Sequence, residues 1–246
     1  MKERLDLLLI ERGHAISRAQ AQALIRAGRV RVGGKVLDKP GTPVPSDAPI
    51  EVTEPPAFVS RGGEKLAAAL DAFGVDPGGR VCLDVGASTG GFTDCLLQRG
   101  AARVYAVDVG RGQLDWRLRN DPRVVVREGV NARHLRAEDV GEPVDLATVD
   151  VSFISLRLVL PPLGSVVKPG GDVIALVKPQ FEAGREQVRR GVVRDPAVHQ
   201  AVVEGIASFA REELGWEVRG SIPSPLLGPA GNREFFLHLV PSLRTG

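Results

Sequence analysis

The chain alternates short apolar runs with stretches of helical periodicity from about residue 81 to residue 177. A strand that is buried on both faces reads as a continuous apolar run, as in parallel sheets whose faces are covered by helices. A sixth run follows a long proline-containing loop, so we expect its strand to insert antiparallel. The sequence thus predicts an α/β fold with a doubly wound, mostly parallel sheet, whose strands lie near residues 81–85, 104–107, 124–126, 146–150, 173–177 and 235–240.

The first fifty or so residues follow another pattern. Leu5, Leu8 and Leu9 predict a short amphipathic helix, and the capping box S-R-A-Q at 17–20 predicts a second helix that ends at Gly28. The sequence R-V-R-V-G-G-K-V-L around Gly33 is typical of a β-hairpin, and residues 50–53 predict one more strand. This part is predicted to be a small α+β domain.

Prolines recur between residues 38 and 58, where large apolar residues are few. Such a composition is typical of a stiff linker. We therefore expect a first domain at residues 1–54, a linker at 55–60 and a second domain at 61–246.

Basic residues gather in the first domain. Residues 12–39 hold seven basic side chains against one acid, a net charge of +6 in 28 residues, whereas from Arg61 onward 23 basic residues balance 23 acidic ones. A basic helix beside a basic hairpin can follow a phosphate backbone without reading bases; an ordinary charged surface or a dimerisation module are the alternatives. The candidate contacts to such a polyanion are Arg4, Arg18, Gln22, Arg26, Arg29, Arg31 and Lys35.

The composition indicates the cellular compartment and the kinds of partner to expect. No apolar run reaches membrane-spanning length, and the N-terminal residues lack the layout of a signal peptide. Cys82 and Cys95 are the two cysteines, with no C-x-x-C motif and no histidine cluster. We expect a cytoplasmic protein with no disulfide framework, no metal site and no membrane partner.

A glycine-rich loop follows the first strand of the second domain, in C-L-D-V-G-A-S-T-G-G-F. Its form is D-x-G-x-S-x-G, which is used for S-adenosylmethionine and differs from the dinucleotide and P-loop patterns. Asp108 ends the next strand, where an acid can accept both hydroxyls of a ribose. Asn131 is placed to contact adenine or, alternatively, to cap a loop. The candidate cofactor contacts are Asp84, Gly86, Ala87, Ser88, Thr89, Gly90, Gly91, Phe92, Asp108, Val109 and Asn131.

Two lysines and two acids are candidates for the reacting groups. Asp150 and Lys178 end the fourth and fifth strands, and ligands of open parallel sheets bind outside these carboxyl ends. Lys65 flanks the apolar stripe of the helix before the first strand, and Glu234 begins the last strand. A hydroxyl group that attacks a methyl carbon must lose its proton, and a lysine takes it only if partly neutral, which burial and a second cation favour.

Each of the four residues also has a structural interpretation. Lys65 alone would be a surface lysine, Asp150 a helix cap, Glu234 a member of a surface ion pair and Lys178 a lysine whose amine reaches solvent. Their joint position around one crevice favours the catalytic interpretation. Glu182 is taken as a loop residue without a role.

The motifs G-A-S-T-G-G-F-T-D-C-L-L-Q-R-G-A, V-D-V-G-R-G-Q-L, D-V-S-F-I-S-L, L-V-K-P-Q-F-E and G-N-R-E-F-F resemble the TlyA family, with its RrmJ/FtsJ-like methyltransferase domain. R-L-D-L-L-L, S-R-A-Q-A-Q-A-L-I-R-A-G-R-V-R-V-G-G and K-P-G resemble the RNA-binding domain named after ribosomal protein S-four. The resemblance implies a Rossmann-like class I fold and 2′-O-methylation of cytidine in ribosomal RNA by S-adenosylmethionine. It also implies that Lys65, Asp150, Lys178 and Glu234 are the catalytic tetrad. Nucleotide, ribosomal subunit and oligomeric state stay open.

Other functions fit these residues less well. Methylation of a pyrimidine carbon normally needs a cysteine nucleophile, but both cysteines lie in expected core elements. Methylation of an exocyclic amine usually shows a Pro-Pro-aromatic loop where this chain has D-V-S-F. A non-catalytic ribosome-assembly factor would not need the tetrad, and no segment supports the membrane-lytic activity that the family's haemolysin label suggests.

Overall fold

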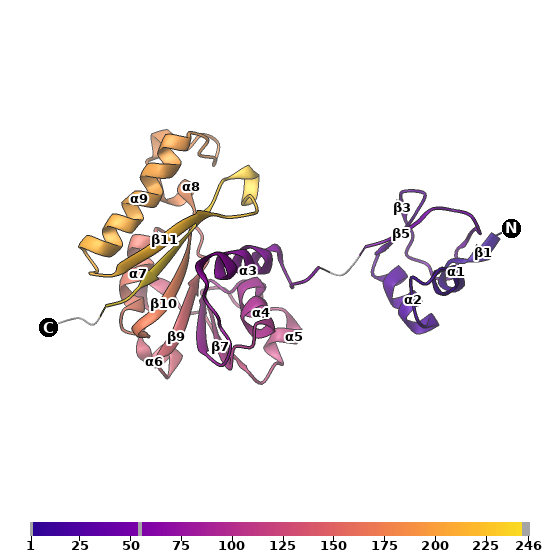
Figure 1. The fold of residues 1–246 in the computed structure, drawn as a ribbon, viewed down its shortest axis with the longest axis horizontal. Coiled ribbons are helices and arrows are strands. Elements are labelled where there is room, and N and C mark those ends of the chain that lie inside the picture. The colour runs from indigo at the N-terminus through magenta and orange to yellow at the C-terminus, as the bar shows by residue number, and fades with distance from the viewer. Residues whose placement is uncertain (1, 54–55, 243–246) are drawn as a thin grey trace. The chain divides into compact units, whose positions relative to one another are not determined.

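The structure is a computed structural model that describes residues 2–53 and 56–242. It divides into two compact units, Met1–Pro56 and Ala57–Gly246, which are described separately (Figure 1). The boundary expected at residues 54 and 55 lies outside the described residues.

The N-terminal unit packs two helices against short strands. Ser17 caps the second helix by accepting a hydrogen bond from the backbone N–H of Gln20, as the capping box predicts. The Gln20 side chain accepts from the N–H of Ile16 rather than from that of Ser17. The hairpin and the strand after it are confirmed as one three-stranded antiparallel sheet. A second, two-stranded sheet (β1 and β4) was not predicted. The elements are β1 (Lys2–Arg4), α1 (Leu5–Glu11), α2 (Arg18–Arg26), β2 (Val30–Val32), β3 (Lys35–Val36), β4 (Pro43–Pro45) and β5 (Ile50–Val52).

The C-terminal unit is built on one seven-stranded sheet with the order β11-β12-β10-β9-β6-β7-β8. The five strands predicted to be parallel are parallel, and the last strand pairs antiparallel with both of its neighbours, as expected. The predicted doubly wound sheet is confirmed. The strands are β6 (Val81–Val85), β7 (Arg103–Asp108), β8 (Val124–Glu128), β9 (Val144–Val149), β10 (Val167–Val177), β11 (Glu217–Pro223) and β12 (Phe235–Val240).

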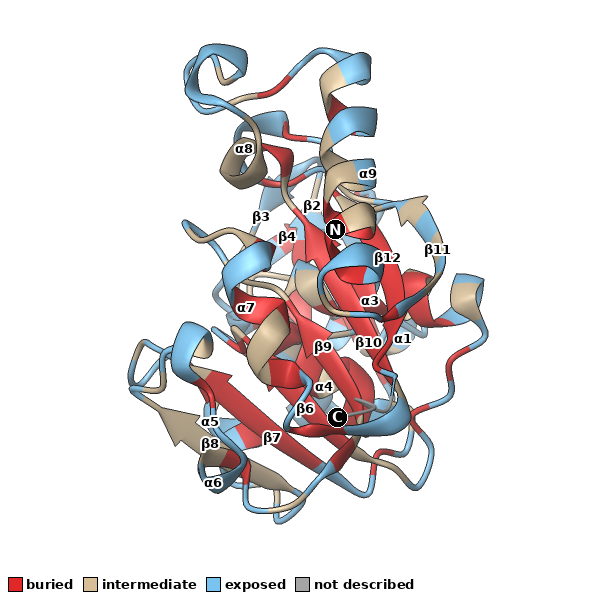
Figure 2. Ribbon diagram, turned by 90° about the vertical axis from the view of Figure 1, so that its left-hand side faces the viewer, coloured by how far each residue is buried: buried red, intermediate tan, exposed pale blue. Residues whose placement is uncertain are grey.

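Helices cover both faces of this sheet, and the strands between them are largely buried (Figure 2). One face packs Leu66 and Leu96, from α3 and α4, and the other packs Leu160 and Ile206, from α7 and α9, into separate apolar clusters. Helices on both faces explain why the central strands are apolar throughout. The helices are α3 (Arg61–Phe73), α4 (Gly91–Gln98), α5 (Trp116–Arg119), α6 (Ala137–Val140), α7 (Leu156–Leu163), α8 (Pro179–Glu182) and α9 (Pro196–Glu212), with 3₁₀ turns at Ala132–His134, Arg185–Gln187 and Pro229–Gly231.

Chain order reverses at the centre of the sheet. From β6 the chain builds outward through β7 and β8, and then returns to the other side of β6 as β9. A crevice opens at such a switch point, outside the carboxyl ends of the two strands. The ends of β6 and β9 therefore mark where a ligand is expected.

Candidate active site

The loops after β6 and β9 touch at the switch point. The backbone N–H of Asp150 donates to Val85 O at 2.9 Å, and that of Gly86 donates to Val107 O at 2.8 Å. Gly86 has a φ of +87°, and a Cβ there would lie 2.4 Å from the carbonyl oxygen of Asp150. Only glycine fits this position, because any side chain would be strained and would collide with backbone.

The glycine-rich loop lines a cavity of about 330 Å³ at this point. Six of the predicted cofactor residues form part of its wall: Gly86, Ala87, Ser88, Thr89, Gly91 and Phe92. Gly90 does not reach the cavity wall, because it lies beneath Leu114 and Leu118. The N-terminus of α3 supplies Ser60, Arg61 and Gly62 to the same wall, which the sequence analysis did not foresee.

Asp84 lies beneath the loop rather than in the cavity. Its side chain is fully buried and accepts a hydrogen bond from Thr93 Oγ1 at 2.7 Å. Burial raises the pKa of Asp84 to about 7. Direct contact with a cofactor, as predicted for Asp84, is therefore not supported, since the residue lines neither cavity of the crevice. We infer that it holds the loop to α4.

A second cavity, of about 460 Å³, continues from the first and shares Gly86, Ser88 and Asp150 with it. Asp108, Val109 and Asn131 line this second cavity. The structure thus brings the predicted ribose and adenine contacts beside the glycine-rich loop.

Asp108 and Asn131 are both fixed by local hydrogen bonds. The carboxylate of Asp108 accepts from the backbone N–H groups of Ser88 and Gly110 at 2.8 and 2.7 Å, and each oxygen keeps a lone pair for a ligand. Asn131 Oδ1 accepts from the N–H of Arg133 at 3.0 Å. Asn131 therefore caps a turn, and it also lines the cavity where the adenine contact is expected.

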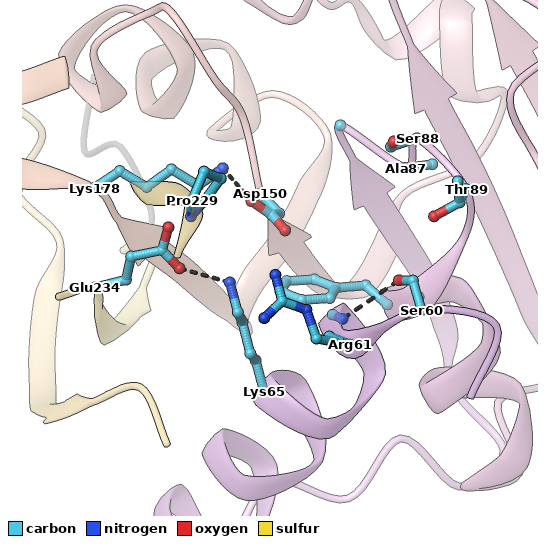
Figure 3. Close-up of a pocket in the computed structure, with 14 residues that line it drawn as sticks. Ser60, Arg61, Lys65, Ala87, Ser88, Thr89, Asp150, Lys178, Pro229 and Glu234 are labelled. Atoms are coloured by element: carbon cyan, nitrogen blue, oxygen red, sulfur yellow. Dashed lines mark hydrogen bonds and ion pairs between the residues drawn. The ribbon is translucent and has the colours of Figure 1, made fainter. Parts of the chain in front are cut away.

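The four candidate reacting groups all line the first cavity and form two ion pairs (Figure 3). Lys65 Nζ lies 2.6 Å from Glu234 Oε2, and Lys178 Nζ lies 2.6 Å from Asp150 Oδ1. Lys178 Nζ also donates to Ser152 Oγ at 2.9 Å. These positions match the expectation that the four meet around one crevice, and Lys65 itself is buried.

The Lys65–Glu234 pair is the deeper of the two. The Glu234 side chain is fully buried and that of Lys65 is 10% exposed, against 24% and 11% for Asp150 and Lys178. Glu234 Oε1 has no hydrogen-bond partner within residues 2–53 and 56–242. Buried acceptors are normally satisfied, so this oxygen is available to a donor that enters the cavity.

Glu182 was wrongly taken as a loop residue without a role. It ends α8, and its carboxylate accepts from Ser155 Oγ at 2.6 Å and from the backbone N–H of Leu156 at 2.7 Å. Burial raises the pKa of Glu182. Its contacts lie at the start of α7, where the positive end of the helix dipole favours a carboxylate. Glu182 thereby ties the segment after Lys178 to the loop after Asp150.

Phe153 is a further residue that the sequence analysis missed. It lines the second cavity, its side chain is 90% exposed, and its φ of +63° is unusual for a residue with a side chain. Its ring lies 4.9 Å from that of Phe181. An exposed aromatic at the mouth of a ligand cavity offers a stacking surface for a base; the phenylalanine in D-V-S-F was the available signal.

Three of the predicted polyanion contacts in the N-terminal unit converge on a buried acid. Asp6 is fully buried and accepts from Arg4 at 3.0 Å, Arg18 at 3.1 Å and Gln22 at 3.0 Å. The hydrogen bonds from Arg4 hold the pKa of Asp6 far below its usual range. These side chains are thus partly committed to the fold of the unit.

The remaining four candidates differ in exposure. Arg26, Arg31 and Lys35 are exposed, and Arg29 is half-buried. Arg31 donates to Gly34 O at 3.2 Å. The exposed basic groups of α2 and the hairpin are therefore the better candidates for contact with a polyanion.

Cysteine-based catalysis, metal binding and membrane insertion find less support in the described residues. Cys82 and Cys95 are buried, and burial raises the pKa of each thiol to about 12, so neither is a thiolate near neutral pH. In the described part of the chain, no group of three or more His, Cys, Asp or Glu side chains is arranged to hold a metal ion. Among the same residues, no helix has the length and apolarity needed to cross a membrane.

Comparison with known proteins adds two family matches. The family described as FtsJ-like methyltransferase matches residues 58–240, and the S4 domain matches residues 3–50.

The 16S/23S rRNA (cytidine-2′-O)-methyltransferase TlyA of Mycobacterium tuberculosis is 52% identical over 97% of this chain and 90% of its own. Hemolysin A of Brachyspira hyodysenteriae is 39% identical over 96% of this chain and 99% of its own. A solved structure of a candidate hemolysin from Streptococcus thermophilus has 44% identity and a TM-score of 0.75, and covers 98% of this chain and 89% of its own.

Proposed function

The chain belongs to the FtsJ-like methyltransferase family, and from that membership we propose that it methylates the ribose 2′-OH of cytidine in ribosomal RNA, with S-adenosylmethionine as methyl donor. The observation that carries this proposal is the meeting of Lys65, Asp150, Lys178 and Glu234 in one cavity that continues into the cavity of Asp108 and Asn131. The relative from M. tuberculosis bears the name of this activity. The proposed site of action is the cytoplasm, on ribosomal subunits.

The residues of the crevice fit the proposed cofactor. Gly86 leaves room for a ligand against the backbone, and Asp108 is held with free acceptor capacity for ribose hydroxyls. S-adenosylmethionine, when bound, supplies an electrophilic methyl group on a sulfonium sulfur. Asp108 would hold the ribose, Asn131 and Val109 would border the adenine, and Ser88 would lie where the two cavities join.

Lys178 is the proposed acceptor of the 2′-OH proton. The hydroxyl proton would pass to Nζ of Lys178, which must first release one of its own protons from the ion pair with Asp150. The methyl group would move from the sulfonium sulfur to the hydroxyl oxygen, so that charge and atoms balance. Asp150 and Ser152 hold Nζ in place. The Lys65 ammonium lies in the same cavity, where it stabilises the negative charge that develops on the attacking oxygen. Placement of these groups accounts for the rest of the catalysis.

Mapping of the modified nucleotide tests the proposal. Both ribosomal RNAs are treated with the protein and S-adenosylmethionine, and reverse-transcription stops are compared with those of untreated RNA. We expect a new stop at a cytidine whose 3′ linkage resists alkali, because a 2′-O-methyl group blocks cleavage at its own nucleotide. A methylated position that alkali still cleaves would instead indicate base methylation. Liposome leakage caused by the purified protein would favour the haemolytic alternative suggested by the relative from B. hyodysenteriae.

The basic face of the N-terminal unit gives a separate prediction. Arg26→Gln/Lys35→Gln is expected to weaken RNA binding and to lower the slope of log affinity against log salt by up to about 1.4, or roughly 0.7 for each lost phosphate contact to single-stranded RNA. Filter binding at several salt concentrations measures both quantities. Arg18→Gln is the comparison, because loss of its bond to buried Asp6 should lower the melting temperature as well. An unchanged salt slope in the double variant would assign this face another role.

A further inference from the structure

A third cavity lies on the α9 face of the sheet, away from the predicted site residues. Its volume is about 630 Å³, within the range of small-molecule pockets. Arg194, His199 and Gln200 at the start of α9 line one side, and Arg233 and Phe235 at the start of β12 line the other. We call it the arginine cavity.

A buried asparagine fixes the walls of the arginine cavity. Asn232 is 2% exposed; its Oδ1 accepts from the N–H of Val193 at 3.2 Å, and its Nδ2 donates to Gly191 O at 2.9 Å. His199 Nε2 lies 2.9 Å from Val193 O. The segment before α9 and the loop before β12 are therefore held together. Arg194 and Arg233 directly follow the two joined residues, so their Cα positions are set by this frame.

The unpaired charge in the arginine cavity is positive. Both arginines are exposed, and within the described residues neither makes a side-chain hydrogen bond or an ion pair. Glu204 also lines the cavity, but it accepts from Arg211 at 2.9 Å. The neighbouring Asp195 accepts from the N–H of Ala197 at 2.8 Å. Two arginines that line one cavity without a carboxylate partner offer the charge and the donors that a phosphate group accepts.

Arg233 of the arginine cavity and Glu234 of the active site are adjacent in the sequence, just before β12. Successive side chains of a strand point to opposite faces. Glu234 and Phe236 belong to the face of Lys65 and Phe92, whereas Phe235 packs against His199 on the α9 face. Arg233 shares the α9 face with Phe235. A polymer bound at Glu234 can therefore cross the end of β12 and reach Arg233.

We propose that the arginine cavity binds a nucleotide of the substrate RNA next to the methylated one, with its phosphate between Arg194 and Arg233. The apolar floor around Phe235 then lies against the ribose and base, and Gln200 offers a hydrogen bond. This inference rests on the proposed RNA methyltransferase function. It adds a backbone contact on the catalytic unit, whose overall charge is neutral.

Steady-state kinetics of Arg194→Gln/Arg233→Gln test the proposal. Initial rates of methyl transfer are measured against RNA concentration at several salt concentrations, with cofactor affinity measured by calorimetry. We expect the KM for RNA to rise roughly tenfold or more, since charge-assisted hydrogen bonds are lost. The salt slope should fall by about 0.7, the value for one phosphate contact to single-stranded RNA. The kcat and the cofactor affinity should stay within about twofold of wild type.

The control is Arg117→Gln/Arg123→Gln, which removes the same charge from exposed arginines that pair with acids in their own turns. Arg194→Lys/Arg233→Lys keeps the charge and should recover most of the RNA affinity if a phosphate is the ligand. An unchanged KM and salt slope, or an equal change in the control, overturns the proposal. So does tight binding of cytidine monophosphate that depends on both arginines but leaves the KM for RNA unchanged. If wild-type protein does not methylate ribosomal RNA at all, the proposed function itself fails.

Discussion

Replacing Lys178 by methionine is expected to lower the rate of methyl transfer by about 10²–10⁴-fold, the usual contribution of a general base. Methionine keeps most of the apolar volume of the lysine stem but has no amine. The lost amine is the one that Asp150 and Ser152 hold at the carboxyl end of β10. A tritium-transfer assay on ribosomal RNA measures the rate, and calorimetry measures cofactor affinity, which should change little.

Asp108→Asn provides the reciprocal control for Lys178→Met. It removes the charge of the proposed ribose ligand and should weaken cofactor binding, with transfer recovering at saturating cofactor. The two variants thus separate proton removal from cofactor affinity. Near-wild-type transfer by Lys178→Met would remove Lys178 from the role of base.

The second large effect is expected at the buried pair of Lys65 and Glu234. Lys65→Met leaves the Glu234 carboxylate buried without its partner, and removal of one member of a buried pair costs about 3–5 kcal/mol of unfolding free energy. The double variant Lys65→Met/Glu234→Gln removes both charges and should recover much of that loss while staying inactive. Chemical denaturation gives the unfolding free energies, and the transfer assay gives the activities.

The pair of Lys168 and Asp145 is a matched comparison, because its two charged atoms are also 2.6 Å apart but its side chains are 46% and 31% exposed. Lys168→Met should change the unfolding free energy by about 1 kcal/mol or less, as is usual for exposed pairs. If the Lys65→Met/Glu234→Gln variant were fully active, the pair would be structural only. If Lys65→Met were as stable as wild type, the burial argument would be wrong.

The fold of the catalytic unit was largely predictable, because buried strands carry a strong apolar signal. The bounds of β6 and β12 agree with the predicted runs, and β12 is antiparallel as expected. The strand β11 was missed because it lies at the edge of the sheet and alternates exposed with half-buried residues. An edge strand of this kind has no continuous apolar run, and sequence pattern alone does not separate it from a loop.

The sequence predicts that the four candidate groups gather at one crevice, as they do, but not which ion pairs they form. Topology alone places Asp150 and Lys178 at one end of the sheet, since the carboxyl ends of parallel strands meet there. The sequence does not reveal which distant partners pair: which acid pairs with Lys65, or that Arg18 donates to Asp6. A count of charges in a basic segment does not reveal that one buried carboxylate accepts hydrogen bonds from several of them.

The ties between α8 and the loop after β9 bear on how such a sequence can diverge. The ring of Phe181 packs at a tilt against that of Phe153, and Glu182 caps the helix that follows that loop. A substitution in either the loop after β9 or α8 would disturb these contacts, and with them the spacing between Lys178 and Asp150, unless the other segment changed too. We therefore expect the two segments to change together among relatives. Chimaeras between relatives should keep residues 150–156 and 178–182 from the same parent.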